Sequence, residues 1–194
     1  MPSPLGHFLA GLSVGIATDS QPPPARRPLS SYATPFSLLA VAMAAAPDID
    51  LMVPDAIEPH FHRTATHSIT AVVLLFIVSM FVTGQVTPQV NRWRVSAILA
   101  LAWATHLLMD WLGADPSIPS GIQLLWPFSE RTSSRGSDWF PAIERDIHAS
   151  HFLVQNTTAA IVEIVVGVPL VAFGLFINAR RGAARAGRVL VEDR

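Results

Sequence analysis

The stretch that decides the fold is 68–86, which reads SITAVVLLFIVSMFVTGQV and contains no charged side chain. A helix needs roughly 20 predominantly apolar residues to cross the hydrocarbon core of a bilayer, and this stretch comes close to that length. A run of this kind is typical of a transmembrane helix. The sequence therefore predicts a membrane-spanning helix over residues 68–86.

The composition of the whole chain agrees with a membrane protein. Of its 194 residues 51% are hydrophobic and only 14% are charged, and the mean hydropathy is +0.41. These values are unusual for a soluble domain. The start, Met1-Pro2-Ser3-Pro4, has no basic residue ahead of the first apolar stretch, so a removable signal peptide is not expected.

Four further apolar stretches flank this helix. Residues 94–112 and 157–177 are long enough to span a membrane and carry a few polar side chains, whereas 5–17 and 32–46 are shorter. The shorter two are predicted to be tilted or shallow spans, or helices packed against the others. We expect an all-α, polytopic membrane helical bundle with about five apolar helices and a long extracytoplasmic segment, 113–156, between the last two. Residues 1–179 would form one membrane-embedded domain and 180–194 an arginine-rich cytoplasmic tail.

The charges predict an orientation and exclude one class of partner. The formal net charge is −1 and all 13 basic residues are arginine, so no nucleic-acid partner is expected. Short cytoplasmic loops are enriched in basic residues. Nine of the 13 arginines lie between the first two helices, between the third and fourth, or after the last. That side is predicted to be the cytoplasm, which leaves the N-terminus, 47–67 and 113–156 on the other side.

Histidines and aspartates gather on the predicted extracytoplasmic side. The chain has no cysteine, so a metal would have to be bound by His, Asp or Glu. His106 and Asp110 are four apart on a predicted helix and share one face, and the other candidates lie at the ends of different helices, as metal sites in helical bundles require. The predicted metal ligands are His7, Asp48, Asp50, His62, His67, His106 and Asp110.

Each candidate also has a purely structural interpretation. Asp48 or Asp50 can cap a helix or end a turn after Pro47. His7 can be a hydrogen-bonded interior histidine, and His106 with Asp110 can be a pair that satisfies itself inside the bundle. Ser68 is expected to cap the helix that follows it while His67 points into the bundle.

Taken in order, these motifs resemble the membrane-bound metal-dependent hydrolases, also described as LexA-binding, inner-membrane-associated hydrolases. The resemblance covers most of the chain. It rests on Gly6-His7, Pro47-Asp48-Ile49-Asp50, His62-Arg63 with Thr66-His67-Ser68, the segment His106–Asp110 and Leu124-Leu125-Trp126-Pro127-Phe128. The chain departs from the family at Thr64, where relatives often have Gly, and at Leu51, where they often have His. The second departure removes one possible ligand.

The resemblance implies a function, a location and a set of site residues. It implies a multi-pass protein of the bacterial inner membrane. It also implies a bound divalent cation, with zinc as the first candidate and manganese or magnesium as alternatives. Glu144 is implied to have a catalytic role. The order of the motifs is also remotely similar to the zinc-dependent phospholipase C and single-strand nuclease superfamily. That similarity implies a metal-activated water that cleaves a phosphoester or phosphodiester, with Arg63 holding phosphate oxygens. A site at the membrane boundary favours a lipid or lipid-linked phosphate substrate.

Two other classes of function compete with this interpretation. One is a membrane regulator or scaffold that binds a LexA-like protein partner through its cytoplasmic tail, with the metal only structural. The other is a transporter in which His106, Asp110 and Glu163 form a proton or ion path, because ionisable groups inside a membrane are functional by default. The boundary position of most candidate residues speaks against transport.

Overall fold

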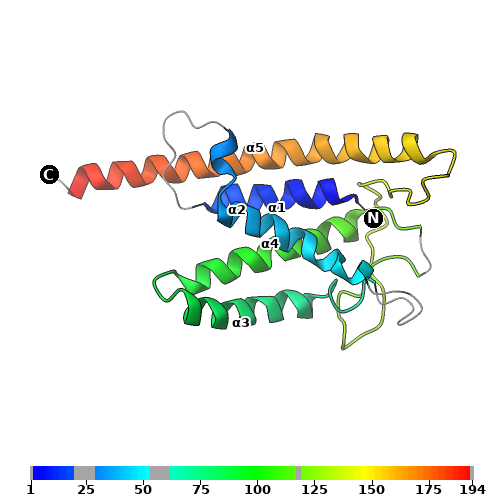
Figure 1. The fold of residues 1–194 in the computed structure, drawn as a ribbon, viewed down its shortest axis with the longest axis horizontal. Coiled ribbons are helices and arrows are strands. Elements are labelled where there is room, and N and C mark those ends of the chain that lie inside the picture. Colours follow the sequence, from blue (N-terminus) through cyan, green and yellow to red (C-terminus); the bar gives the residue numbers. More distant parts are fainter. Residues whose placement is uncertain (1, 20–28, 53–61, 117–118, 193–194) are drawn as a thin grey trace.

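The computed structural model describes residues 2–19, 29–52, 62–116 and 119–192, and within these ranges every regular element is helical. Five α-helices follow in the order α1 (Pro4–Thr18), α2 (Pro35–Ala45), α3 (Ile69–Val86), α4 (Arg92–Leu112) and α5 (Phe152–Glu192), with short 3-10 helices η1 (Leu29–Tyr32) and η2 (Ala46–Met52) around α2. The helices form one elongated bundle (Figure 1). The predicted all-α bundle is therefore confirmed.

Local sequence signals explain where four of these helices begin. Ser3 and Thr34 accept hydrogen bonds from first-turn backbone N–H groups, and a proline directly follows each of them. Ser68 caps α3 as predicted, with its side chain accepting from the Ala71 N–H, and Asn91 does the same for α4. Such caps satisfy backbone donors that a helix leaves open in its first turn.

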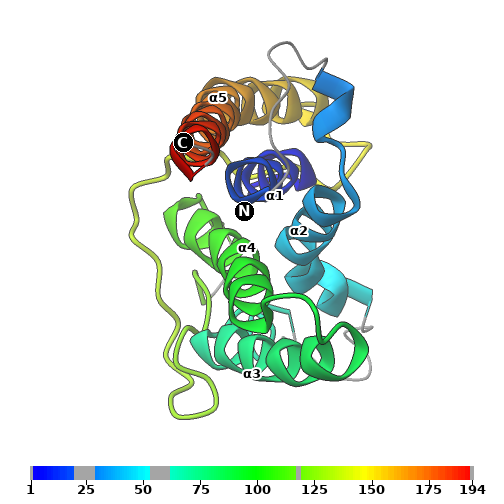
Figure 2. The same cartoon turned by 90° about the vertical axis from the view of Figure 1, so that its left-hand side faces the viewer.

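Helix α1 lies at the centre of the bundle. It packs against α5, α2 and α4, whereas α3 packs on α4 alone, an arrangement visible end-on in Figure 2. Two glycines let α1 and α2 approach closely: an added Cβ on Gly11 would lie 2.7 Å from the Ala44 Cβ, and one on Gly15 would lie 2.7 Å from the Ser37 Cα. Small residues at helix contacts are the usual means of close packing inside membranes.

Four of the helical stretches are long and apolar enough to cross a membrane: 35–52, 69–86, 92–112 and 152–184. Residues 4–18 fall below that length, so of the alternatives for the first apolar stretch the structure favours a helix packed among others. The second stretch is longer than predicted because η2 continues α2. Helix α5 begins before residue 157 and runs on past the predicted domain boundary at 179/180 to Glu192.

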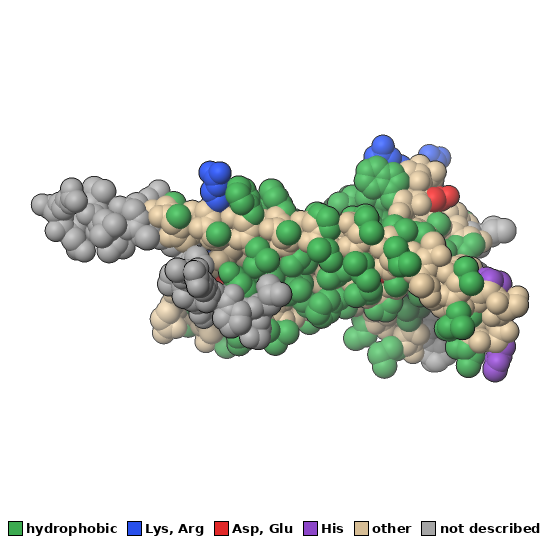
Figure 3. All heavy atoms as spheres, turned by 90° about the horizontal axis from the view of Figure 1, so that it is seen from above, with side chains coloured by type: hydrophobic (Ala, Val, Ile, Leu, Met, Phe, Trp, Pro, Cys, Tyr) green, Lys and Arg blue, Asp and Glu red, His purple; other side chains and the backbone are tan. Residues whose placement is uncertain are grey.

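The surface of the bundle is apolar where lipid would surround it. Only Ser79 of α3 is buried, and Figure 3 shows apolar side chains spread over the middle of the molecule. Exposed apolar residues of α3 include Val73, Leu74, Ile77, Val78, Phe81 and Val82. Such a surface suits a hydrocarbon environment and not water.

Candidate metal centre

Four helical elements bring the candidate side chains to one end of the bundle. The first turns of α1 and α3, the last turns of α4, and η2 after α2 meet on the right-hand side of Figure 1. These elements carry His7, Asp48, His67, His106 and Asp110. The convergence arises from the up-and-down course of the chain, which returns each candidate to the same end.

Five short separations connect four polar atoms of this cluster. The Nε2 atoms of His67 and His106 are 3.1 Å apart, and each lies 3.3 Å from Asp110 Oδ2. Asp48 Oδ1 lies 3.6 Å from His67 Nε2 and 3.5 Å from His106 Nε2. His67, His106 and Asp110 therefore form one group of close ligand atoms, and Asp48 joins His106 and His7 in an adjoining group.

The separations among His67, His106 and Asp110 match the spacing of ligands around one metal ion. With metal–ligand distances of 2.0–2.2 Å, the corners of a tetrahedron lie about 3.3–3.5 Å apart. Two imidazole nitrogens and two carboxylate oxygens suit zinc and other borderline divalent ions, and two aspartates neutralise a charge of +2. The donor set and its geometry thus fit a divalent cation.

Buried polar atoms without a hydrogen-bond partner point to the same place. Among the described residues, both oxygens of Asp110, Oδ1 of Asp48 and both ring nitrogens of His7 have none. Such orphaned atoms are costly inside a protein and need an explanation such as a bound ion. His7 Nε2 lies 3.6 Å from Asp110 Oδ1, and its ring stacks on His106 at a centroid distance of 3.8 Å. His7 therefore lies beside the group of His67, His106 and Asp110, and forms a further group with Asp48 and His106.

The outer nitrogens of both histidines are held by hydrogen bonds. His106 Nδ1 lies 2.8 Å from the Ala44 carbonyl oxygen and donates to it, which leaves Nε2 as the lone-pair donor toward the cluster. His67 Nδ1 lies 3.2 Å from Asp50 Oδ2. Partners of this kind orient metal-binding histidines and fix their tautomer.

Asp50 is the centre of a second web of contacts. Its carboxylate accepts from the Thr66 hydroxyl at 2.6 Å and the Arg63 backbone N–H at 3.2 Å, and it lies 2.6 Å from His62 Nδ1. The side chains of Asp50, His62, Asp48 and His67 could also hold a second ion. Because Asp50 contacts His67 through Nδ1 and not Nε2, the geometry favours orientation of His67 as its main role.

The electrostatics of His67 show how strongly the carboxylates act on this cluster. Burial lowers the pKa of His67, but hydrogen bonding to Asp110, Asp48 and Asp50 outweighs burial and holds this pKa well above its usual value. The site therefore favours positive charge at its centre.

Arg63 lies beside the cluster and is positioned by its backbone. It adopts a left-handed conformation (φ 73°), and its carbonyl accepts from the Gln123 N–H at 3.0 Å. Its guanidinium pairs with Asp115, which also accepts from the Gly121 N–H at 2.6 Å. The loop after α4 thus holds the arginine next to Asp50.

Glu144 lies in a different group of contacts. Its carboxylate accepts from the Asp146 N–H and lies 2.9 Å from His151 Nε2, and its backbone pairs with Asn156. The Asp146 backbone and His151 lower its pKa below the usual value. No described contact joins Glu144 to the histidine–aspartate cluster.

Several residues of this region have partners that the sequence did not reveal. Asp115 pairs with Arg63, Trp103 Nε1 donates to the Thr66 carbonyl at 2.9 Å, and Glu163 bonds the first turn of α1. The partner of Trp103 and two of the three donors to Glu163 are backbone groups. Backbone groups are present at every position, so no sequence pattern identifies them.

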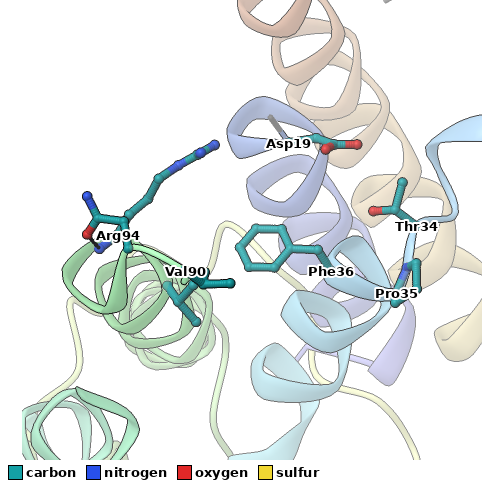
Figure 4. Close-up of a pocket in the computed structure, with 8 residues that line it drawn as sticks. Asp19, Thr34, Pro35, Phe36, Val90 and Arg94 are labelled. Carbon is teal, nitrogen blue, oxygen red and sulfur yellow. Dashed lines mark hydrogen bonds between the residues drawn. The ribbon is translucent and has the colours of Figure 1, made fainter. Parts of the chain in front are cut away.

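A cavity of about 280 Å³ lies at the other end of the bundle, among α1, α2 and α4. Figure 4 shows Arg94 and Asp19 at its edges and Phe36 in its wall. The guanidinium of Arg94 already donates to the Thr18 carbonyl. The cavity is thus separate from the candidate metal centre.

Asn in place of Asp50 tests the orienting contacts. The amide keeps the size of the side chain but removes its charge and one acceptor, so His67 loses its fixed orientation. We expect metal affinity to fall roughly 10- to 100-fold, as measured by competition with a chelating dye. Asp138→Asn, at an exposed position, should leave the affinity unchanged. An unchanged affinity in Asp50→Asn would contradict the orienting role.

Comparison with known proteins gives one match. A family model described as YdjM inner membrane protein matches residues 1–189. No curated protein and no solved structure matches the chain.

Proposed function

Since the chain belongs to the YdjM inner membrane protein family, we propose that it is a membrane-bound, metal-dependent hydrolase that cleaves a phosphoester or phosphodiester of a lipid or lipid-linked substrate. The observation that carries this proposal is the close group of His67, His106 and Asp110 with Asp48 beside it, in which buried carboxylate oxygens have no hydrogen-bond partner. Zinc is the first candidate, with manganese and magnesium as alternatives.

The roles of the residues follow from their chemistry. The cation would be held by Asp48, His67, His106 and Asp110. It would be bordered by His7, Asp50 and His62. A cation in this position would lower the pKa of a bound water and polarise a phosphoryl oxygen. Asp48 is the open edge of the set, because 24% of its side chain is exposed whereas that of Asp110 is fully buried. Substrate would therefore approach past Asp48.

Arg63 and Glu144 are proposed to act on the substrate. A guanidinium can bind two phosphate oxygens at once; the backbone N–H of Arg63 contacts Asp50, while its guanidinium pairs with Asp115. Glu144 is proposed as a proton acceptor on the grounds of family resemblance. Its lowered pKa supports acceptance and not donation of a proton, although its described contacts are with the segment 144–156.

The surroundings of Asp48 favour a lipid substrate. Ile49 and Met52 flank it on η2 with 63% and 79% of their surfaces exposed, and they belong to a stretch apolar enough to lie in a membrane. Apolar side chains at the edge of a polar site suit a substrate whose head is charged and whose tail is hydrocarbon.

We also propose that the site faces away from the cytoplasm. Arg94 and Arg181 both donate to carbonyls at the last turn of α1, Thr18 and Ala17, at the end opposite to His7. Cytoplasmic ends of membrane helices are enriched in arginine. This supports a location in the inner membrane with an outward-facing site.

The experiment that tests the function combines metal analysis with turnover. Detergent-purified protein is analysed for bound zinc and manganese and then assayed on a long-chain phospholipid and on a water-soluble phosphodiester of the same head group. We expect about one ion per chain and faster cleavage of the lipid in mixed micelles. Protein that binds no ion and cleaves neither compound after addition of divalent cations would refute the proposal.

Arg63→Ala and Arg63→Lys test the phosphate contact. Alanine removes the guanidinium, and lysine restores the charge without the two-pronged geometry. We expect kcat/KM for a phosphodiester to fall on the order of 100-fold in alanine, with partial recovery in lysine, because charge-assisted bonds contribute about 1.5–3 kcal/mol. Arg131→Ala, at an exposed position on the same side, should behave as wild type. Equal kcat/KM in Arg63→Ala and wild type would remove Arg63 from the site.

The alternative function, a regulator that binds a protein partner through its cytoplasmic tail, has one supporting feature. Helix α5 continues unbroken to Glu192 and so presents the arginine-rich end as a helix. Removal of residues 180–194 should abolish partner binding under this alternative and leave metal binding and hydrolysis intact under the main proposal.

A further inference from the structure

Glu163 is a carboxylate buried in the middle of a predicted membrane helix. It belongs to α5, lies within a stretch long and apolar enough to span a membrane, and is 1% exposed. An ionisable group at such a place is costly unless it has partners. The sequence alone identifies no partner for this carboxylate.

The partners of Glu163 are the open donors at the start of α1. Its carboxylate accepts from the Ser3 backbone N–H at 2.5 Å, from the Ser3 hydroxyl and from the Gly6 N–H at 2.9 Å. The first turn of a helix leaves its N–H groups without intrahelical acceptors and carries partial positive charge. A carboxylate from another helix thus completes α1.

The contact lies directly beside the candidate metal centre. Gly6 precedes His7, whose ring stacks on His106. A Cβ on Gly6 would lie 2.6 Å from Met109 Cε and 3.1 Å from Glu163 Cδ, and Met109 precedes Asp110. The carboxylate, the first turn of α1 and the last turns of α4 are therefore close neighbours at Gly6.

From this geometry we infer that Glu163 is a positioning residue of the metal centre, which acts through the first turn of α1 to hold His7 against His106 and Asp110. The inference rests on the proposed function, since it assigns a role within the same site.

The other end of the same helix pair provides a matched control. Asn178 Nδ2 donates to the Ile16 carbonyl at 3.0 Å and to the Asp19 carbonyl at 3.3 Å. Asn178 is buried, like Glu163, and it also bonds α1, but at the end of that helix far from His7. Asn178→Leu should therefore destabilise the bundle without moving the ring of His7.

The experiment is a double-mutant cycle on metal affinity. Zinc affinity is measured by chelator competition in detergent for wild type, Glu163→Gln, His7→Ala, the double variant and Asn178→Leu. We expect Glu163→Gln to weaken zinc binding roughly tenfold and to add nothing in the His7→Ala background, because its effect passes through His7. Asn178→Leu should bind zinc as wild type does. If the loss of zinc affinity in the double variant equals the product of the losses in the two single variants, the inference is overturned.

A second measurement keeps the inference separable from the proposed function. In metal-free protein with ¹⁵N-labelled histidine, Glu163→Gln should shift the ring signals of His7 and leave those of the exposed His148 and His151 in place. Asn178→Leu should leave His7 unshifted. If wild type binds no divalent cation, the proposed function fails, and the His7 signals alone decide whether Glu163 positions that ring. Unshifted His7 signals in Glu163→Gln would overturn the inference in either case.

Discussion

Asp110→Asn should abolish metal binding while leaving the bundle folded. Asp110 Oδ2 lies 3.3 Å from both His67 Nε2 and His106 Nε2, and both of its oxygens lack hydrogen-bond partners. The substitution removes one of two negative charges and replaces an oxygen by an NH₂ group that cannot bind a cation. Because Asn is almost the same size as Asp, the packing of α4 should survive.

The measured quantity is the increase in the free energy of unfolding when zinc is added. An ion that binds only the folded state at 100 times its dissociation constant stabilises by about 2.7 kcal/mol. Wild type should show this gain as a rise in Tm, and Asp110→Asn should show none. Asp138→Asn, which changes an exposed aspartate in the same way, should keep the full gain. A zinc-dependent rise in Asp110→Asn equal to that of wild type would remove Asp110 from the ligand set.

Gly11→Leu should be the most damaging substitution away from the cluster. A Cβ at this position would lie 2.7 Å from the Ala44 Cβ, 2.9 Å from the Val41 Cα and 3.0 Å from the Ala40 oxygen. Two of these atoms are backbone, so α2 cannot yield without moving as a whole. Overpacking of this kind costs about 1–3 kcal/mol and sometimes more, and we expect the upper end of that range.

The same substitution should also weaken metal binding, because α1 carries His7 and α2 leads directly into Asp48. Unfolding in mixed micelles with rising SDS measures stability, and dye competition measures zinc affinity. Gly84→Ala is the matched control, since its Cβ would meet only the flexible side chain of Arg92, at 3.2 Å. Replacement of an interior helix glycine by alanine is favourable by up to about 1 kcal/mol. Equal stability of Gly11→Leu and wild type would contradict the close α1–α2 contact.

The sequence was a good guide to the parts of the fold that depend on hydrophobic runs. The expected span 68–86 corresponds to α3 (Ile69–Val86), and 94–112 corresponds to α4 (Arg92–Leu112). The boundaries of α5 were wrong, because hydropathy detects the portion in hydrocarbon and not the helix that continues beyond it. The short α1 is explained by burial: a helix among other helices does not need to match the thickness of a bilayer.

The meeting of the candidate side chains also followed from the sequence, although the division of their contacts did not. Alternating helix directions place His7, Asp48, His67, His106 and Asp110 at one end, and the structure brings them together. Which ring nitrogen faces the centre depends on Asp50 and on the carbonyl of Ala44. Those details depend on tertiary packing, and neither periodicity nor spacing encodes them.

The capping of α1 by α5 has a consequence for how the chain is made. Helix α1 leaves the ribosome first, yet the acceptors and donors that complete its two ends, Glu163 and Asn178, belong to the last helix. A nascent chain that ends after Asp110 already contains every predicted metal ligand but lacks the contacts of Glu163 and Asn178 with the two ends of α1. Assembly of the centre must therefore wait for synthesis of α5, so that a truncated protein would carry the ligands without the site.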